Sequence, residues 1–210
     1  MVMYDPEYLR LARVLCDRYQ VHLIADEIMV GFGRTGTLFA HEQAGIRPDF
    51  LCLSKGLTGG YLPLSVVLTT DEVYAAFYDD AVTRGFLHSH SYTGNPLACR
   101  AALAPLDLFA EDGVLERNRR FGELLTVRLA PLADHPQARH FRRRGMIWAV
   151  DIATDDPDFR LRFYRAALQR ELLLRPLGTT VYFMPPYILT DEEATLLADG
   201  AAAALDAALA

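Results

Sequence analysis

Short apolar runs alternate with helix-forming runs along the first half of the chain, and this alternation restricts the possible folds more than any other feature of the sequence. Three runs have the length and composition of buried strands: "VHLIADEI", "DFLCLSK" and "LPLSVVLTT". Helical patterns flank them, in "DPEYLRLARVLCDRY", "DEVYAAFYDD" and "NPLACRAALAPLDLFAEDG". Strands that alternate with helices predict an α/β fold with a largely parallel sheet.

Residues that favour helix ends support this division. Asn95 followed by Pro96 predicts a helix that begins at the proline, with the asparagine as its N-cap. We also expect Asp71 to cap the helix in "DEVYAAFYDD". A further helix is predicted over about residues 114–133.

The pattern changes from about Arg139 onward. "GMIWAVDIA" predicts a strand, "DFRLRFYRAALQREL" a helix, and "LLLRP" and "TTVYFMPP" two short strands. The last helix opens with a capping box formed by Thr190 and Glu193. These elements predict a separate, smaller α+β domain, with the boundary inside "PLADHPQARHF". We therefore assign residues 1–134 to part of a large α/β domain with a connecting helix, and residues 135–210 to the small domain.

Charge and cysteine content exclude several classes of protein. The net charge is −6, which argues against nucleic acid or an anionic membrane as a partner. The densest run of arginines, "RHFRRRG", is short and is typical of a solvated edge. Cys16, Cys52 and Cys99 form no CxxC pair, which indicates free thiols in a reducing cytoplasm.

Lys55 is the only lysine in the chain, because the other 20 of its 21 cationic residues are arginines. Arginine replaces lysine wherever a positive charge is sufficient, but it cannot act as an amine that attacks a carbonyl. Lys55 ends one predicted strand, and Asp26 and Glu27 end another. A lysine that forms a Schiff base and a buried carboxylate that keeps a pyridine nitrogen protonated are the two groups that pyridoxal phosphate requires.

Two other motifs allow different interpretations. "GFGRTG", residues 31–36, fits the glycine pattern of dinucleotide-binding loops, although the next strand ends in Lys55 and not in the acid that would bind ribose. The glycines also suit a tight turn with positive φ.

"HSHSYTGNP", residues 88–96, places His88 and His90 at a spacing that could hold a metal, but no third ligand is nearby. The hydroxyl groups of Ser91, Tyr92 and Thr93 precede a helix N-terminus, where phosphate binds readily. These residues could also serve only to cap the helix.

The segment from "LIADEIMVGFGRTG" to "SKGLTGGYLPLSVVLTTDEVY" resembles the class III, fold-type I pyridoxal-phosphate aminotransferases. "HSHSYTGNPLACRAAL" and "LLLRPLGTTVYFMPPYILT" resemble the branch of this family that acts in biotin synthesis on S-adenosylmethionine and 8-amino-7-oxononanoate. The resemblance runs over nearly the whole chain. It implies a cytoplasmic homodimer with its sites at the subunit interface.

The resemblance also implies roles for five residues. Asp26 would pair with the pyridine nitrogen, and Lys55 would be the Schiff-base lysine that shuttles the proton. Ser91 would contact the cofactor phosphate of the neighbouring subunit. Arg175 would hold the substrate carboxylate, and Tyr182 would line the substrate pocket.

The chain corresponds to about the C-terminal half of a family member. The missing half would contain the first strands of the large domain, the aromatic ring that stacks on the cofactor, and a phosphate loop. The chain could be truncated, one product of a split gene, or a partial gene model. We expect it to bind the cofactor weakly or not at all when it is alone.

Overall fold

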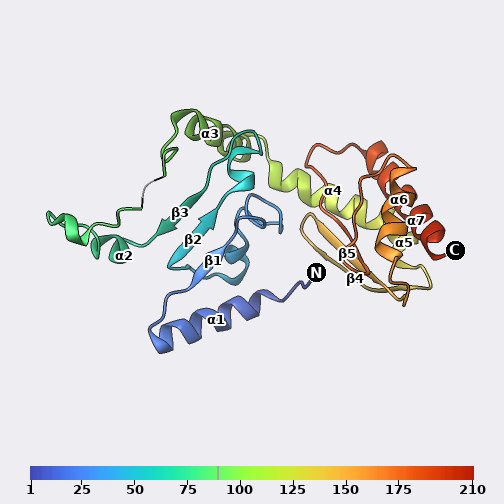
Figure 1. Cartoon of the computed structure of the whole chain (residues 1–210), viewed down its shortest axis with the longest axis horizontal. Coiled ribbons are helices and arrows are strands. Elements are labelled where there is room, and N and C mark those ends of the chain that lie inside the picture. Colours follow the sequence, from blue (N-terminus) through green and yellow to red (C-terminus); the bar gives the residue numbers. More distant parts are fainter. Residues whose placement is uncertain (89) are drawn as a thin grey trace. The chain divides into compact units, whose positions relative to one another are not determined.

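The computed structural model describes residues 1–88 and 90–210. Figure 1 shows the path of the chain and labels most of its elements. In chain order they are α1 (Pro6–Tyr19), β1 (Ile24–Asp26), η1 (Ala40–Ala44), β2 (Phe50–Leu53), η2 (Lys55–Thr58), β3 (Val66–Thr69), α2 (Asp71–Ala75), η3 (Val82–Arg84), α3 (Pro96–Glu111), α4 (Val114–Arg128), α5 (Ala130–Ala133), β4 (Ala138–Arg144), β5 (Ile147–Ile152), α6 (Phe159–Leu168), β6 (Thr180–Phe183) and α7 (Asp191–Leu209), where η denotes a 3-10 helix.

The chain forms two compact units. The N-terminal unit is Tyr4–Leu115, and the C-terminal unit consists of Met1–Met3 and Glu116–Ala210. This division falls before the 134/135 boundary expected from the sequence, because Leu125 of α4 and Leu132 of α5 are buried in the core of the C-terminal unit. The 134/135 boundary remains a prediction about the domains of the whole protein.

The N-terminal unit contains a sheet with the order β1-β2-β3. β1 and β2 are parallel, as expected, but β3 is antiparallel to β2. The expectation of a largely parallel sheet is therefore met by only one of the two strand pairs described in this unit. Twelve residues separate β2 from β3, and they form the short 3-10 helix η2 and a return loop in place of the crossover helix that usually joins a parallel pair.

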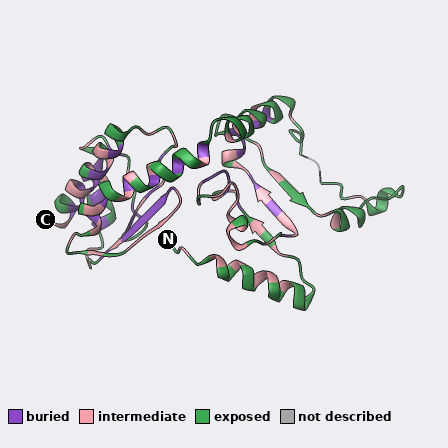
Figure 2. Ribbon diagram, turned by 180° about the vertical axis from the view of Figure 1, so that it is seen from behind, coloured by how far each residue is buried: buried purple, intermediate pink, exposed green. Residues whose placement is uncertain are grey.

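The C-terminal unit is an antiparallel sheet with helices packed against it. Its strand order is β4-β5-β6, and the arginine-rich run forms the edge strand β4. Figure 2 shows the buried residues concentrated on β5 and on the helices near it. Trp148 of β5 is fully buried, and its indole Nε1 donates a hydrogen bond to Thr126 Oγ1 at 2.9 Å. The apolar core of this unit is larger than that of the N-terminal unit.

The expected helix ends are confirmed at two places and wrong at one. The Asn95 side chain accepts hydrogen bonds from the amides of Leu97 and Ala98. The capping box of Thr190 and Glu193 is present. The cap of α2, however, is Thr70 and not Asp71, because the Thr70 hydroxyl reaches the third amide of the helix while Asp71 is its first residue.

One further expectation is wrong. "LLLRP" is not a strand, and the only pairing of this region in the described structure is an isolated bridge between Leu177 and Thr180. No helix among the described residues is both long enough and apolar enough to cross a membrane.

Candidate active site

Asp26 and Lys55 lie at the same edge of the sheet in the N-terminal unit. β1 and β2 are parallel, and Asp26 is in register with Cys52, three residues before Lys55. Three residues span at most about 11 Å of backbone, so the two side chains start close together. The carboxyl ends of parallel strands are where open α/β sheets bind ligands. The register places both residues at one edge of the sheet, and their roles toward a cofactor remain a prediction.

The buried acid is Glu27 and not Asp26. Asp26 is exposed, and its carboxylate accepts one hydrogen bond, from the amide of Ile28 at 3.1 Å. Glu27 is only 3% exposed. The chain turns sharply after β1, which directs the first acid outward and the second inward. Asp26 and Lys55, both exposed, thus remain available to a ligand.

The backbone at Lys55 is held in an uncommon conformation. Its φ is 44°, in the left-handed region that a residue with a Cβ seldom adopts. The Ser54 hydroxyl donates to the Leu64 carbonyl at 2.7 Å, and the Thr58 hydroxyl donates to the Leu62 carbonyl at 2.5 Å. One of these hydrogen bonds lies before Lys55 and the other after it, so together they fix the turn that carries the amine.

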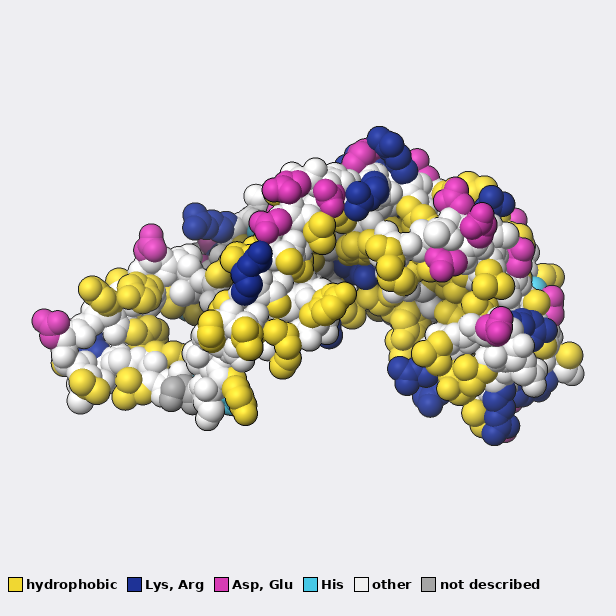
Figure 3. Space-filling view, turned by 90° about the horizontal axis from the view of Figure 1, so that it is seen from above, with side chains coloured by type: hydrophobic (Ala, Val, Ile, Leu, Met, Phe, Trp, Pro, Cys, Tyr) yellow, Lys and Arg dark blue, Asp and Glu magenta, His cyan; other side chains and the backbone are white. Residues whose placement is uncertain are grey.

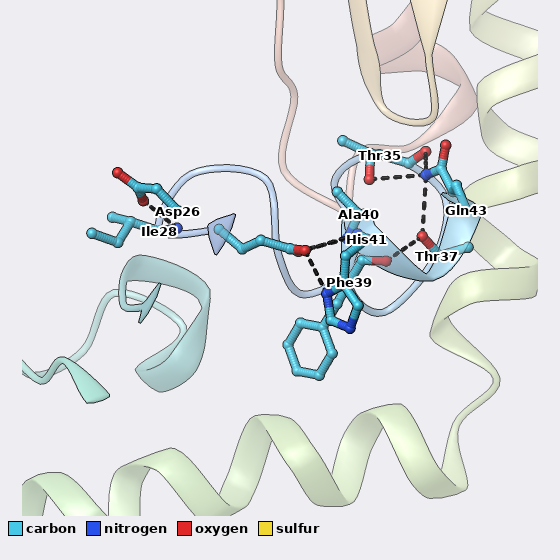
Figure 4. A network of polar contacts seen from close by, with 9 residues as sticks. Asp26, Ile28, Thr35, Thr37, Phe39, Ala40, His41 and Gln43 are labelled. Carbon is cyan, nitrogen blue, oxygen red and sulfur yellow. Dashed lines mark hydrogen bonds and ion pairs between the residues drawn. The ribbon is translucent and has the colours of Figure 1, made fainter. Parts of the chain in front are cut away.

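The loop between β1 and η1 is fixed by a polar network that the sequence did not reveal (Figure 4). The Glu27 carboxylate accepts hydrogen bonds from the amides of Ala40 and His41, at 2.5 and 2.8 Å, and from His41 Nδ1 at 2.8 Å. The Gln43 amide donates to Thr35 and to the Thr37 hydroxyl. The only sequence signal for this network was the pair of adjacent acids, Asp26 and Glu27, after an apolar strand. The hydrogen-bond partners of Glu27 lie 13 and 14 residues further along the chain.

The glycine motif uses its amide groups within its own loop. Gly31 N donates to the Glu27 carbonyl, Gly33 N to the Leu38 carbonyl and Gly36 N to the Gly33 carbonyl. A dinucleotide loop needs such amides for its pyrophosphate. Gly33 and Gly36 have φ values of 86° and 107°. The motif therefore acts here as a tight turn and does not present a phosphate cradle.

The contacts of the segment before α3 partly support helix capping, the simplest of the three interpretations given above for residues 88–96. The first free amides of α3 are capped by Asn95, and the Thr93 hydroxyl accepts a hydrogen bond from the amide of His90. Among the described residues, no group of three potential metal ligands includes His88 or His90. Ser91 is exposed in a turn, and no described contact joins it to Asp26 or Lys55. Its phosphate-binding role remains a prediction.

Arg175 and Tyr182 come together in a groove of the C-terminal unit. The groove has a volume of about 560 Å³, and its lining is mainly apolar. Arg175 is exposed and Tyr182 is half-buried. The residues that line it are Leu172, Leu173, Leu174, Arg175, Tyr182, Phe183, Met184, Pro185, Pro186, Leu189, Glu193, Leu196 and Leu197.

These features define a class of protein. A lone amine and an exposed carboxylate at the ends of adjacent parallel strands fit the donor set that pyridoxal phosphate needs. A second unit supplies a guanidinium beside an apolar groove. The amine and the carboxylate of the N-terminal unit are the residue types typical of pyridoxal-phosphate-dependent enzymes.

Comparisons with known proteins agree. The family described as "Aminotransferase class-III" matches residues 1–205, so the chain belongs to the class III aminotransferases. It is 45% identical to the adenosylmethionine-8-amino-7-oxononanoate aminotransferase of Helicobacter pylori, over 98% of this chain and 49% of the relative.

Solved structures give the same result. The enzyme of the same name from Methanocaldococcus jannaschii superposes with a TM-score of 0.90 at 33% identity, over 98% of this chain and 50% of that one. An ω-transaminase from Thermomicrobium roseum has a TM-score of 0.85 at 32% identity, over 95% and 46%. The chain thus spans about half the length of the relatives it matches.

Proposed function

We propose that this chain is the cofactor-anchoring part of an aminotransferase of biotin synthesis. The reaction transfers the amino group of S-adenosylmethionine to 8-amino-7-oxononanoate and gives 7,8-diaminononanoate. The observation that carries the proposal is the placement of Lys55, the only lysine, beside Asp26 at the ends of two adjacent parallel strands. The names of the relatives supply the substrates. A cytoplasmic location suits the three free cysteines.

The cofactor would be pyridoxal phosphate, which when bound supplies an aldehyde for amines and a ring that accepts electrons from the substrate carbon. The Lys55 amine would anchor it and would then carry a proton between two carbon positions. The Asp26 carboxylate would hold the proton on the ring nitrogen. Both groups are exposed in this chain, so neither has to break a buried interaction to do so.

Arg175 would bind the substrate carboxylate. A guanidinium presents a planar fork that matches the two carboxylate oxygens. The groove beside it is apolar and would accept the aliphatic chain of 8-amino-7-oxononanoate, with Tyr182 against it. A guanidinium beside an apolar groove suits a substrate with an aliphatic chain that ends in a carboxylate.

The enzyme would be a homodimer, in which Ser91 contacts the cofactor phosphate of the neighbouring subunit. Figure 3 shows hydrophobic side chains at the surface around α2. Large apolar side chains at this surface are 46–74% exposed, which is unusual for a surface that faces water. They are Tyr74, Phe77, Tyr78, Val82, Phe86, Leu87 and Tyr92.

The 210-residue chain alone would bind the cofactor weakly or not at all. In the described sheet, β1 and β3 are both edge strands, and Ile24, Val67 and Leu68 are more than half exposed. Unpaired strand edges with apolar side chains favour pairing with another segment. A complementary N-terminal half would supply it.

A second transaminase function is supported by the ω-transaminase from Thermomicrobium roseum, whose structure is similar over nearly the whole chain. The amino donor separates the two functions. Turnover with S-adenosylmethionine and not with alanine supports the biotin-pathway reaction, and the reverse supports the ω-transaminase. A chain that gains no activity from any N-terminal half would be a non-catalytic fragment.

The deciding experiment adds pyridoxal phosphate to the purified chain, with and without an N-terminal half from a relative. The visible spectrum is recorded, borohydride is added, and the labelled peptide is mapped. We expect a label on Lys55 that is much stronger when the N-terminal half is present. The matched control is K55R, which keeps the charge and should remove both the band and the label. No label on Lys55 in either sample would overturn the proposal.

A further inference from the structure

Glu27 is a buried carboxylate to which the proposed chemistry assigns no role. It is 3% exposed and accepts three hydrogen bonds, all from Ala40 and His41 at the start of η1. Hydrogen bonds to an ionised group are roughly twice as strong as neutral ones. Burying a carboxylate without such partners would cost several kcal/mol. Glu27 therefore fastens the two ends of the loop 28–39 together.

The loop that Glu27 closes carries Phe32. The His41 ring is stacked on Phe39, with centroids 5.9 Å apart, and Phe39 meets Phe32 edge-on at 5.6 Å. Phe32 is 3% exposed and has a φ of 56°, so its position depends on the loop around it. A continuous series of contacts thus runs from Glu27 through the rings of His41 and Phe39 to Phe32.

Phe32 packs directly against the residue after Lys55. A Cβ built on Gly56 would lie 2.8 Å from Phe32 Cβ and 2.9 Å from Phe32 Cδ2. Lys55 itself has a φ of 44°, which costs on the order of 1–2 kcal/mol for a residue with a side chain. A conformation of this kind persists only when its surroundings enforce it. Phe32 is the packed side chain that presses on this turn.

We propose that Glu27 is a positioning residue for Lys55: by closing the loop 28–39 it holds Phe32 against Gly56 and so keeps the turn that presents the amine. The same carboxylate also fixes the backbone immediately after Asp26. The inference rests on the proposed function only in that Lys55 is the amine that anchors the cofactor. The geometry of the turn can be tested without the cofactor.

The test compares E27Q with E42Q in the 210-residue chain. Glu42 lies on the same 3-10 helix but is exposed, so it is a matched control. Amide hydrogen exchange is measured at Ala40 and His41, and at Leu57 and Gly59, whose amides donate to Ser54 and Gly56 and define the turn at Lys55. We expect E27Q to lower protection at both pairs by about tenfold, the loss of one charge-assisted hydrogen bond. E42Q should leave both unchanged.

A general loss of stability in the N-terminal unit is distinguished by the amides that pair β2 with β3 in the same unit, which should keep their protection in E27Q. If E27Q does not fold, F32L provides a second test: it should lower protection at Leu57 and Gly59 while Ala40 and His41 keep theirs. Unchanged protection at Leu57 and Gly59, in E27Q or in F32L, would overturn the inference.

A second readout is the rate at which Lys55 is labelled by pyridoxal phosphate and borohydride when the N-terminal half is present. E27Q should slow it about tenfold relative to E42Q, the same loss of one charge-assisted hydrogen bond. No label on wild-type Lys55 would count against the proposed function alone, since the exchange measurement still decides the role of Glu27. Equal labelling rates in the two variants, with wild-type Lys55 labelled, would overturn the positioning role.

Discussion

The Arg13 guanidinium donates a hydrogen bond to the Asp49 carboxylate at 2.7 Å and so joins α1 to the start of β2. The same carboxylate oxygen accepts the amide of Leu23, just before β1, at 2.6 Å. Asp49 therefore fixes the amino ends of the two strands whose carboxyl ends carry Asp26 and Lys55. Its side chain is 24% exposed and that of Arg13 is 16% exposed, which limits screening by solvent.

The first prediction concerns pH and stability. The hydrogen bond from Arg13, followed by that from the Leu23 amide, holds the pKa of the Asp49 carboxyl below its ordinary value of 3.8. The folded state thus binds this proton less readily than the unfolded state does. The stabilisation is present above pH 3.8 and is lost as the pH falls through the lowered pKa.

We expect D49N to destabilise the N-terminal unit by about 2 kcal/mol at neutral pH, and to remove the part of the pH dependence below pH 4 that belongs to this group. Urea unfolding at several pH values measures both effects. D80N is the control, because Asp80 is exposed in the same unit. An equal loss of stability in D49N at pH 7 and at pH 2 would contradict the assignment.

The second prediction concerns Asp26. In D26N the side-chain oxygen still accepts from the Ile28 amide, so stability should change by less than about 0.5 kcal/mol. The neutral amide can no longer hold a proton on the cofactor ring, and we expect kcat of the assembled enzyme to fall by about a hundredfold or more. Steady-state kinetics beside a thermal melt separates the two effects. Retained kcat in a folded D26N variant would remove Asp26 from the mechanism.

Local signals predicted much of the N-terminal unit correctly. The strands that end at Asp26 and near Lys55, and the start of α3 at Pro96, follow from hydrophobic runs and capping residues. These elements depend on residues that are neighbours in the sequence, so the sequence alone predicts them. The groove with Arg175 and Tyr182 was expected only from the family resemblance, since each residue alone has an ordinary environment.

Features that depend on distant contacts were missed. The antiparallel direction of β3 is set by the tight path after Lys55, where the chain forms η2 and turns back. The burial of Glu27 instead of Asp26 depends on His41, which lies 14 residues away. No periodic pattern encodes which of two adjacent acids faces inward when a strand of three residues ends between them.

The third prediction concerns Arg175. R175A should raise KM for 8-amino-7-oxononanoate by about a hundredfold, because a bidentate charged pair is lost. R175K keeps the charge without the planar fork and should recover only part of the loss. R160A, on the exposed surface of α6, is the control. An unchanged KM for 8-amino-7-oxononanoate in a folded R175A variant would contradict the assignment of Arg175 to the substrate carboxylate.

The last prediction is that the two compact units unfold separately. The C-terminal unit buries a larger apolar cluster, which includes the fully buried Trp148, Phe159 and Phe163. Because Trp148 is the only tryptophan, its fluorescence reports on this unit alone. We expect its urea midpoint to lie above the midpoint for loss of amide protection in β2.

Two variants should move these transitions independently. D49N should lower the β2 midpoint and leave the tryptophan transition in place. V150A, which removes a fully buried side chain from β5, should lower the tryptophan midpoint by an amount equivalent to about 2–3 kcal/mol and leave β2 unaffected. If both variants shift both probes equally, the chain unfolds in one cooperative step, and the units are coupled in a way that their separate cores do not predict.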